Sequence, residues 1–258
     1  MQIKTLSISN REGFSLAARL DLPGGTKPDA MVLYAHCFTC SKNLKAAAYL
    51  SRGLVARGLA VCRFDFTGLG ESAGTFADTT FSSNVDDLED VAAWLEKAFD
   101  APQLLIGHSL GGAAVIQAAG RLPAVTAVVT IGAPSDPRHV LGHLSPVRHQ
   151  IEARGEAPIQ VDGRTFIFKS SFIEDLEQTD QAGAIRDLHR PLLVLHAPGD
   201  EIVSIDHAGQ IFQAARHPKS FISLDGADHL LSDPEQARYA GELIAAWASK
   251  YLGRAPIR

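Results

Sequence analysis

Apolar residues follow two alternating patterns along the chain. Short continuous apolar runs, typical of strands buried on both faces of a sheet, alternate with longer segments in which apolar residues recur as on one face of a helix. The runs that we interpret as strands are 31–36, 103–106, 127–131, 191–196 and 220–224. Ahead of all of them, 3–9 and 15–21 predict an antiparallel hairpin. This alternation predicts an α/β fold, in which a mostly parallel central sheet is flanked by helices.

The predicted helices have recognisable ends. Ser41 is a suitable cap for a helix that runs to Arg57 and ends at Gly58. Ser83 or Asn84 would cap a second helix. Its apolar residues fall on one face and would pack on the sheet: Val85, Leu88, Val91, Ala92 and Leu95.

Composition and charge narrow the class of protein. The 258 residues are 46% hydrophobic and 21% charged, which suits one α/β domain over 1–258 with a large core. The net charge of -5, without a basic patch, argues against binding to nucleic acid. Apolar runs are too short for a membrane span and the polar start lacks a signal-peptide core, so we expect a cytoplasmic protein without membrane contacts. Three cysteines do not predict a disulfide framework, and the oligomeric state stays open.

One segment carries the chemistry most directly. The apolar run 103–106 leads into Gly107-His108-Ser109-Leu110-Gly111, and an alanine-rich helix follows at 112–119. Small residues on both sides of the serine allow the sharp turn from strand to helix that is called a nucleophile elbow. The turn would expose Ser109 at the edge of the sheet, with the amide of Leu110 free to donate to an oxyanion.

A serine hydroxyl needs a base and an orienting acid, which in this architecture follow it in the chain. The run 191–196 ends in a loop that contains Asp200, and the run 220–224 ends in a loop that contains His229. Neighbouring parallel strands bring such loops together at one sheet edge. We therefore predict that Ser109, Asp200 and His229 are the catalytic residues.

Three other aspartates compete with Asp200 for the role of the acid. Asp136 follows the strand 127–131, and some enzymes of this architecture take their acid from that loop. Asp225 and Asp228 flank the histidine but lie too close in sequence to reach its far ring nitrogen. The strand before Asp200 should lie directly beside the strand before His229, which favours Asp200.

A second oxyanion donor is expected in the loop after the strand 31–36. Many hydrolases have His-Gly-X there, and X donates its backbone N–H. In this chain Cys37 stands at the position of the glycine, so the alignment makes Phe38 the donor beside Leu110. We expect His36 to support the loop rather than to take part in chemistry.

With these motifs, the chain resembles the α/β-hydrolase fold serine hydrolases over nearly its whole length. The stretches 35–43 and 64–72 are similar to the hydrolase portion of bacterial proteins that carry an OsmC-like redox domain after it. We expect no OsmC-like domain in this chain. The resemblance implies a Ser-His-Asp hydrolase with a short cap, and it does not specify a substrate.

The segment 137–180 interrupts the alternation of strands and helices. Asp162-Gly163 lies between alternating apolar runs and predicts a hairpin. An insertion at this point of the fold would cover the active site as a cap. Its apolar side chains could line a substrate pocket or seal the hairpin against the core: Leu141, Leu144, Phe166, Phe168 and Phe172. From these we predict Leu144, Phe166 and Phe168 as substrate-binding residues.

Other patterns in the chain do not favour a cofactor or a metal. The glycines in 65–72 lack the third glycine and the acidic residue of a dinucleotide site, so we interpret them as a structural turn. His139, His143 and His149 have no accompanying ligand pattern, so we expect no metal. The pair Cys37-x-x-Cys40 fits either a redox pair or a simple loop of small residues, and we favour the loop.

The sequence therefore predicts a serine hydrolase without cofactors, most consistent with a carboxylesterase for small to medium acyl esters. A serine peptidase, a thioesterase or a C–C bond hydrolase would use the same three residues, and the fold alone does not separate them. A non-catalytic ligand-binding protein on the same scaffold is a further alternative. Labelling with a fluorophosphonate distinguishes that alternative from an enzyme.

Overall fold

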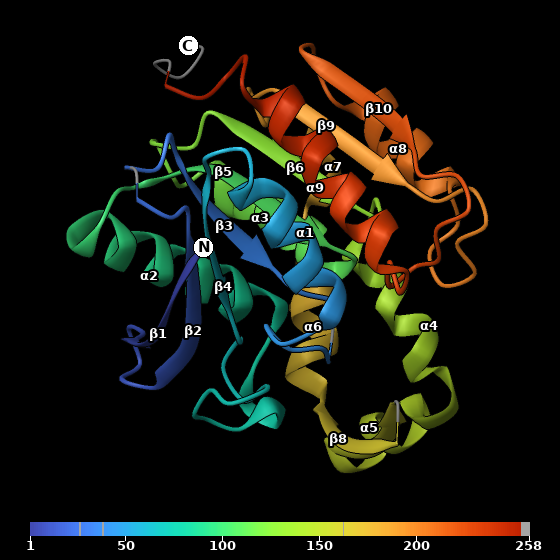
Figure 1. The fold of residues 1–258 in the computed structure, drawn as a ribbon. Helices are drawn as coiled ribbons and strands as arrows, with labels where there is room; N and C mark the ends of the chain where they lie inside the picture. The colour runs from blue at the N-terminus through green and yellow to red at the C-terminus, as the bar shows by residue number, and fades with distance from the viewer. Residues whose placement is uncertain (26, 38, 162, 254–258) are drawn as a thin grey trace.

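A central sheet organises the molecule. The computed structural model describes residues 1–258 except Thr26, Phe38, Asp162 and 254–258. The sheet strands in the described chain are β1 (Gln2–Ser9), β2 (Ser15–Leu22), β3 (Met31–Ala35), β4 (Ala60–Phe64), β5 (Pro102–His108), β6 (Ala127–Ile131), β9 (Leu192–His196) and β10 (Lys219–Ser223). Their order is β1-β2-β4-β3-β5-β6-β9-β10 (Figure 1). The pairs β1–β2 and β2–β4 are antiparallel and the others are parallel, which confirms the predicted sheet.

Helices cover both faces of the sheet (Figure 1). On one face, α1 (Lys45–Val55) and α9 (Pro234–Ala248) pack against each other and against apolar residues of β3, β5 and β9. On the other, α2 (Phe81–Ala98), α3 (Leu110–Ala119) and α8 (Asp206–Ala214) share a second apolar cluster. Glycines permit the close approach of α1 and α9, since a Cβ on Gly53 would lie 2.5 Å from the carbonyl oxygen of Arg238.

The helix starts differ from the sequence prediction for local reasons. The helix α1 begins at Lys45 rather than after Ser41, because the preceding Lys42 is drawn into hydrogen bonds with Asp65. The helix α2 begins at Phe81, because Thr80 caps it. The Thr80 hydroxyl accepts from the amide of Ser83, and the Ser83 hydroxyl accepts from the amide of Thr80.

An insertion separates β6 from β9. It contains η2 (Pro137–Val140), α4 (Leu141–Leu144), η3 (Ser145–Val147), α5 (Arg148–Arg154), β7 (Glu156–Val161), β8 (Arg164–Lys169), α6 (Ser170–Gln178) and α7 (Gln181–Arg186). The strands β7 and β8 pair as an antiparallel hairpin of their own. Of the predicted turn, Gly163 has a left-handed φ of 74°, and Asp162 lies outside the described residues.

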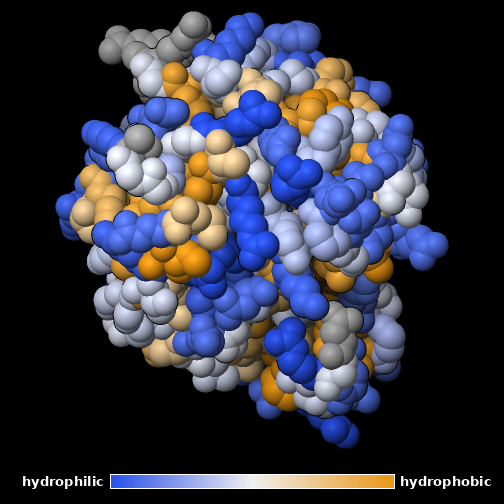
Figure 2. Space-filling view, in the orientation of Figure 1, coloured by the Kyte–Doolittle hydropathy of each residue, from blue (hydrophilic) through white to orange (hydrophobic). Residues whose placement is uncertain are grey.

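The surface is of mixed polarity. On the face shown in Figure 2, hydrophobic residues lie in small groups between hydrophilic ones. Among the helices of the described chain, none is long and apolar enough to cross a membrane.

Candidate active site

Ser109 occupies a sharp turn between β5 and α3. Its backbone has φ 54° and ψ -126°, a conformation that is unfavourable for a residue with a side chain. Neighbouring glycines allow the turn, because a Cβ on Gly107 would lie 2.2 Å from the carbonyl oxygen of Gly111. The amide of Ser109 donates to the carbonyl of Ile131 in β6 at 2.8 Å. The serine is therefore held at the carboxyl end of a central strand, in the geometry of a nucleophile elbow.

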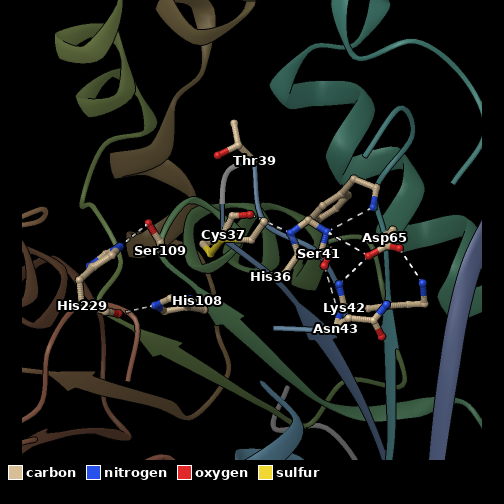
Figure 3. Close-up of a disulfide and its surroundings, with 12 residues drawn as sticks. His36, Cys37, Thr39, Ser41, Lys42, Asn43, Asp65, His108, Ser109 and His229 are labelled. Atoms are coloured by element: carbon tan, nitrogen blue, oxygen red, sulfur yellow. Dashed lines mark hydrogen bonds and ion pairs between the residues drawn. A yellow bond between two sulfur atoms is a disulfide. The ribbon is translucent and has the colours of Figure 1, made fainter. Parts of the chain in front are cut away.

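Ser109, His229 and Asp200 form a continuous chain of hydrogen bonds. The hydroxyl oxygen of Ser109 lies 3.1 Å from Nε2 of His229, and Nδ1 of His229 lies 2.7 Å from Oδ2 of Asp200. Figure 3 shows the histidine ring turned toward the serine. Asp200 follows β9 and His229 follows β10, and these are adjacent parallel strands. The structure thus brings the three residues predicted from the sequence together.

The environment of Asp200 keeps its carboxylate charged. Burial opposes ionisation, but hydrogen bonds from His229 and from the amide of Val203 outweigh it and hold the pKa of Asp200 below its usual value. Its Oδ1 accepts from the amides of Ile202 and Val203 at 2.9 and 2.8 Å. Those two bonds leave Oδ2 facing the histidine.

The competing aspartates have other partners. Asp136 accepts hydrogen bonds from Nε of Arg138 at 2.8 and 2.9 Å. Asp225 accepts from a serine hydroxyl at 2.5 Å, and Asp228 from a backbone amide at 2.7 Å. Asp200 is thus the carboxylate in hydrogen-bond contact with Nδ1 of His229.

Two buried histidines that the sequence did not single out support the loops that carry His229 and Asp200. Nε2 of His108 donates to the carbonyl of His229 at 2.7 Å, and burial lowers the pKa of His108 to about 4. A neutral ring is therefore present at physiological pH. Nε2 of His196 donates to the carbonyl of Val203 at 2.8 Å, in the loop that also carries Asp200. Both histidines end strands, but only the folded structure shows which loops they contact.

The loop after β3 forms the other side of the site. Nδ1 of His36 donates to the carbonyl of Cys37 at 2.7 Å, and its Nε2 accepts from the amide of Phe66 at 3.4 Å. Burial lowers the pKa of His36, which favours this neutral arrangement. Leu110 begins α3 beside the loop, with its amide at the start of the helix. The other predicted donor, Phe38, lies outside the described residues.

A disulfide joins Cys37 to Cys40 in this loop. The sequence analysis favoured a simple loop of small residues, and the structure shows instead that the two cysteines of this loop are bonded. The spacing brings the two Cα atoms to 5.3 Å, within the range in which disulfides form. The third cysteine, Cys62, is buried in β4 as a free thiol.

A cavity of about 400 Å³ lies over Ser109 and His229. The loop of the disulfide forms one wall, and the insertion forms much of the rest. Its polar lining includes His139, which donates to the carbonyl of Ile202 at 3.0 Å, and His143. Within the described chain, no cluster of three histidine, cysteine or acidic side chains could hold a metal ion. The apolar lining includes Pro134, Val140, Ile159, Val161, Val203 and Leu230.

The predicted pocket residues Leu144, Phe166 and Phe168 lie elsewhere. All three are buried in the main apolar cluster, and the rings of Phe166 and Phe168 pack edge-on at 5.1 Å against Phe76. The position of the hairpin explains why these side chains do not line the cavity. Its strand β8 packs against the turn that holds Phe76, whereas β7 contributes Ile159 to the cavity. The insertion therefore lines the cavity through β7, η2 and His143 of α4 instead of these three residues.

A strained serine between a central strand and its helix, in line with a histidine and an aspartate from later loops, defines a serine hydrolase of the α/β-hydrolase fold. Comparison with known proteins agrees. A family model described as "Serine aminopeptidase, S33" matches residues 26–158, and the chain belongs to this hydrolase family.

Similar proteins include an esterase domain and a thioesterase. An esterase domain from a Rhodothermus marinus protein is 50% identical, with a TM-score of 0.80 over 98% of this chain and 100% of that one. Est1E from Butyrivibrio proteoclasticus, solved with ferulic acid, is 19% identical with a TM-score of 0.80 over 95% of this chain and 98% of that one. A mitochondrial palmitoyl-protein thioesterase from Mus musculus is 28% identical over 81% of this chain and 71% of its own length.

Proposed function

We propose that the protein is a serine carboxylesterase that cleaves small to medium acyl esters. The observation that carries the proposal is the chain of contacts from Ser109 through His229 to Asp200, which opens on a largely apolar cavity. The 50% identical esterase domain supports an ester as the substrate class.

The hydrogen bonds define the protonation states that the reaction needs. Ionised Asp200 can only accept, so Nδ1 of His229 carries a proton and Nε2 is free to accept the proton of Ser109. As Ser109 attacks the acyl carbonyl, its proton moves to Nε2, and Asp200 stabilises the resulting imidazolium. The imidazolium then protonates the departing alcohol, and a water molecule activated in the same way hydrolyses the acyl-enzyme.

The negative charge on the substrate oxygen requires nearby donors. The proposed donors are the amide of Leu110 at the start of α3 and the amide of residue 38. The positive end of the α3 dipole points in the same direction, which adds to the stabilisation of an anion beside Ser109.

The cavity suits an acyl group of limited size. Its apolar walls, with Val140 and Ile159 from the insertion, favour a hydrocarbon chain, while its volume of about 400 Å³ lies at the lower end of the range for ligand pockets. We therefore propose these side chains, rather than Leu144, Phe166 or Phe168, as the acyl-binding wall.

The direct test is Ser109→Ala, assayed with p-nitrophenyl esters of graded chain length and with a fluorophosphonate probe. Loss of the nucleophile is expected to lower kcat on the order of a million-fold, as in serine proteases. The wild-type protein should be labelled covalently at Ser109, whereas a non-catalytic binding protein would stay unlabelled. Retention of a tenth of the wild-type activity in Ser109→Ala would exclude this serine as the nucleophile.

A thioesterase is the second candidate, favoured by the similarity to the palmitoyl-protein thioesterase. The same three residues would cleave a thioester, because the acyl-enzyme is identical. Matched oxygen esters and thioesters of one acyl chain separate the two functions. A kcat/KM that is higher for the thioester at every chain length would replace the esterase proposal.

A further inference from the structure

The Cys37–Cys40 disulfide stands in the wall of the active-site cavity. Both cysteines line the cavity together with Ser109 and His229. Figure 3 shows the sulfur bridge beside Ser109, on the side opposite His229. The bridge closes a ring that contains residues 38 and 39, so the proposed second oxyanion donor belongs to that ring whatever its conformation.

The two ends of this loop are anchored independently of the disulfide. Before it, the carbonyl of Cys37 accepts from buried His36. After it, both the amide and the ammonium group of Lys42 donate to Asp65, at 2.5 and 2.7 Å, and the Lys42 carbonyl accepts from Arg63. The Lys42 and Asp65 side chains are almost fully buried, so these ends are fixed to the sheet.

The middle of the loop has a conformation that needs restraint. Thr39 has φ 61°, in the left-handed region, which costs a residue with a side chain about 1–2 kcal/mol. The amide of Cys40 donates to the carbonyl of Cys37 at 3.1 Å to complete the turn, and the guanidinium of Arg164 donates to the carbonyl of Thr39 from the insertion. The disulfide is the covalent restraint on this turn.

We propose that the Cys37–Cys40 disulfide is a redox site that sets the activity of the hydrolase. With the bridge closed, the turn holds Cys37, Thr39 and Cys40 in the wall of the cavity. When the bridge opens, Thr39 can leave the left-handed region, and the wall that Cys37, Thr39 and Cys40 form beside Ser109 changes its shape. This inference rests on the proposed serine-hydrolase function, because it acts through the oxyanion at Ser109.

The reductant that the geometry favours is a small dithiol. Cys40 is partly exposed and Cys37 is buried, so a thiolate of the dithiol attacks Sγ of Cys40 and releases Cys37 as a thiolate, which takes up a proton. The second thiolate of the dithiol then attacks its own sulfur in the mixed disulfide and releases Cys40. The products are two protein thiols and a cyclic disulfide, so two electrons and two protons pass to the protein.

The third thiol does not interfere with this exchange. Cys62 is fully buried in β4, and burial raises its pKa to about 12. It remains a protonated, inaccessible thiol near neutral pH. Thiol titration of the native protein therefore reports on Cys37 and Cys40.

The test compares the oxidised protein, the same protein reduced with a dithiol, and the double variant Cys37→Ser with Cys40→Ser. The main readout is the rate of fluorophosphonate labelling of Ser109, which needs the oxyanion donors but no particular ester. The kcat and KM for a short p-nitrophenyl ester accompany it. Circular dichroism and a count of two new thiols on reduction show that the reduced protein is folded and fully opened.

We expect reduction to slow labelling and to lower kcat by about tenfold to a hundredfold with little change in KM, and reoxidation to restore both. Loss of one whole oxyanion donor costs about 10²–10³ in kcat, and the anchored ends retain part of the geometry. The double variant should have the same labelling rate and kcat as the reduced protein, and the dithiol should change neither value. Equal rates for oxidised and fully reduced protein would overturn the inference, as would slowing of the double variant by the dithiol. Failure of the proposed function differs from both, since Ser109 would not label in any redox state.

Discussion

Asp200→Asn tests the most specific feature of the proposed catalytic site, which is the direction of the hydrogen bonds around Asp200. Oδ1 of Asp200 accepts from two backbone amides, of Ile202 and Val203. An asparagine at this position would keep its single oxygen on those donors and turn its NH₂ group toward His229. Nδ1 of His229 would then have to accept, and the ring proton would move to Nε2, where it blocks removal of the serine proton.

The expected loss is large because the tautomer, not the geometry, is changed. In a serine protease the same change costs about 10⁴-fold in kcat, equivalent to roughly 5 kcal/mol in the activation free energy. The 2.7 Å contact between His229 and Asp200 implies a similarly strong coupling here. We therefore expect a fall on the order of 10⁴ in kcat for p-nitrophenyl esters, with little change in KM.

The matched control is Asp136→Asn, because Asp136 pairs with Arg138 and not with His229. Steady-state kinetics of both variants, with the labelling rate of Ser109, give the comparison. The reasoning fails if Asp200→Asn keeps more than a tenth of the wild-type kcat, or if Asp136→Asn loses as much. The second result would transfer the role of the acid to the loop after β6.

Three further predictions follow from the site. Burial lowers the pKa of His108 to about 4 in the folded protein, against an ordinary value of 6.5. Between these two pH values, the unfolded chain binds a proton on this residue that the folded chain does not bind. The free energy of unfolding is therefore unaffected by His108 above pH 6.5 and decreases as the pH falls from 6.5 to 4. Urea unfolding should show a loss of about 2–3 kcal/mol between pH 7 and pH 4.5 that is absent in His108→Gln, and equal pH dependence in both proteins would contradict it. Ile159→Ala should change the ratio of kcat/KM between long and short acyl esters by about tenfold or more. Phe168→Ala should leave that ratio unchanged and lower the free energy of unfolding by about 3–5 kcal/mol. The opposite pattern would show that side chains of β8, and not of β7, line the acyl pocket. Gly132→Ala would place a Cβ 3.4 Å from Nδ1 of His229, at a residue whose φ is 54°. The displaced histidine should lower kcat by up to about a hundredfold. An unchanged kcat would show that the loop of residue 132 can move without displacing His229.

Much of the active-site geometry could be predicted because its determinants are local or topological. The glycines around Ser109 specify a turn within a few residues. The order of parallel strands then places the loops of Asp200 and His229 side by side without knowledge of any side-chain contact.

The pocket and the loop chemistry could not be predicted in the same way. Alternation in the hairpin shows that Phe166 faces inward, but not that Phe76 rather than substrate lies beneath it. The spacing of Cys37 and Cys40 fits both a bonded and an unbonded loop, and the difference depends on a turn at Thr39 that the sequence does not favour. Such outcomes depend on contacts between segments that are distant in sequence.

The packing of α9 on α1 has a consequence for synthesis of the protein on the ribosome. The proposed nucleophile is Ser109, but its partner His229 follows β10. The helix α9 then packs against α1, where Gly53 lies close to the carbonyl of Arg238. The segment through His229 must therefore leave the ribosome before the proposed site can assemble, and the segment through residue 248 before α9 can pack on α1. At typical elongation rates of roughly 5–20 residues per second, the interval between synthesis of Ser109 and synthesis of its proposed base, His229, is on the order of ten seconds. On the proposed mechanism, Ser109 of the nascent chain is inactive during that interval.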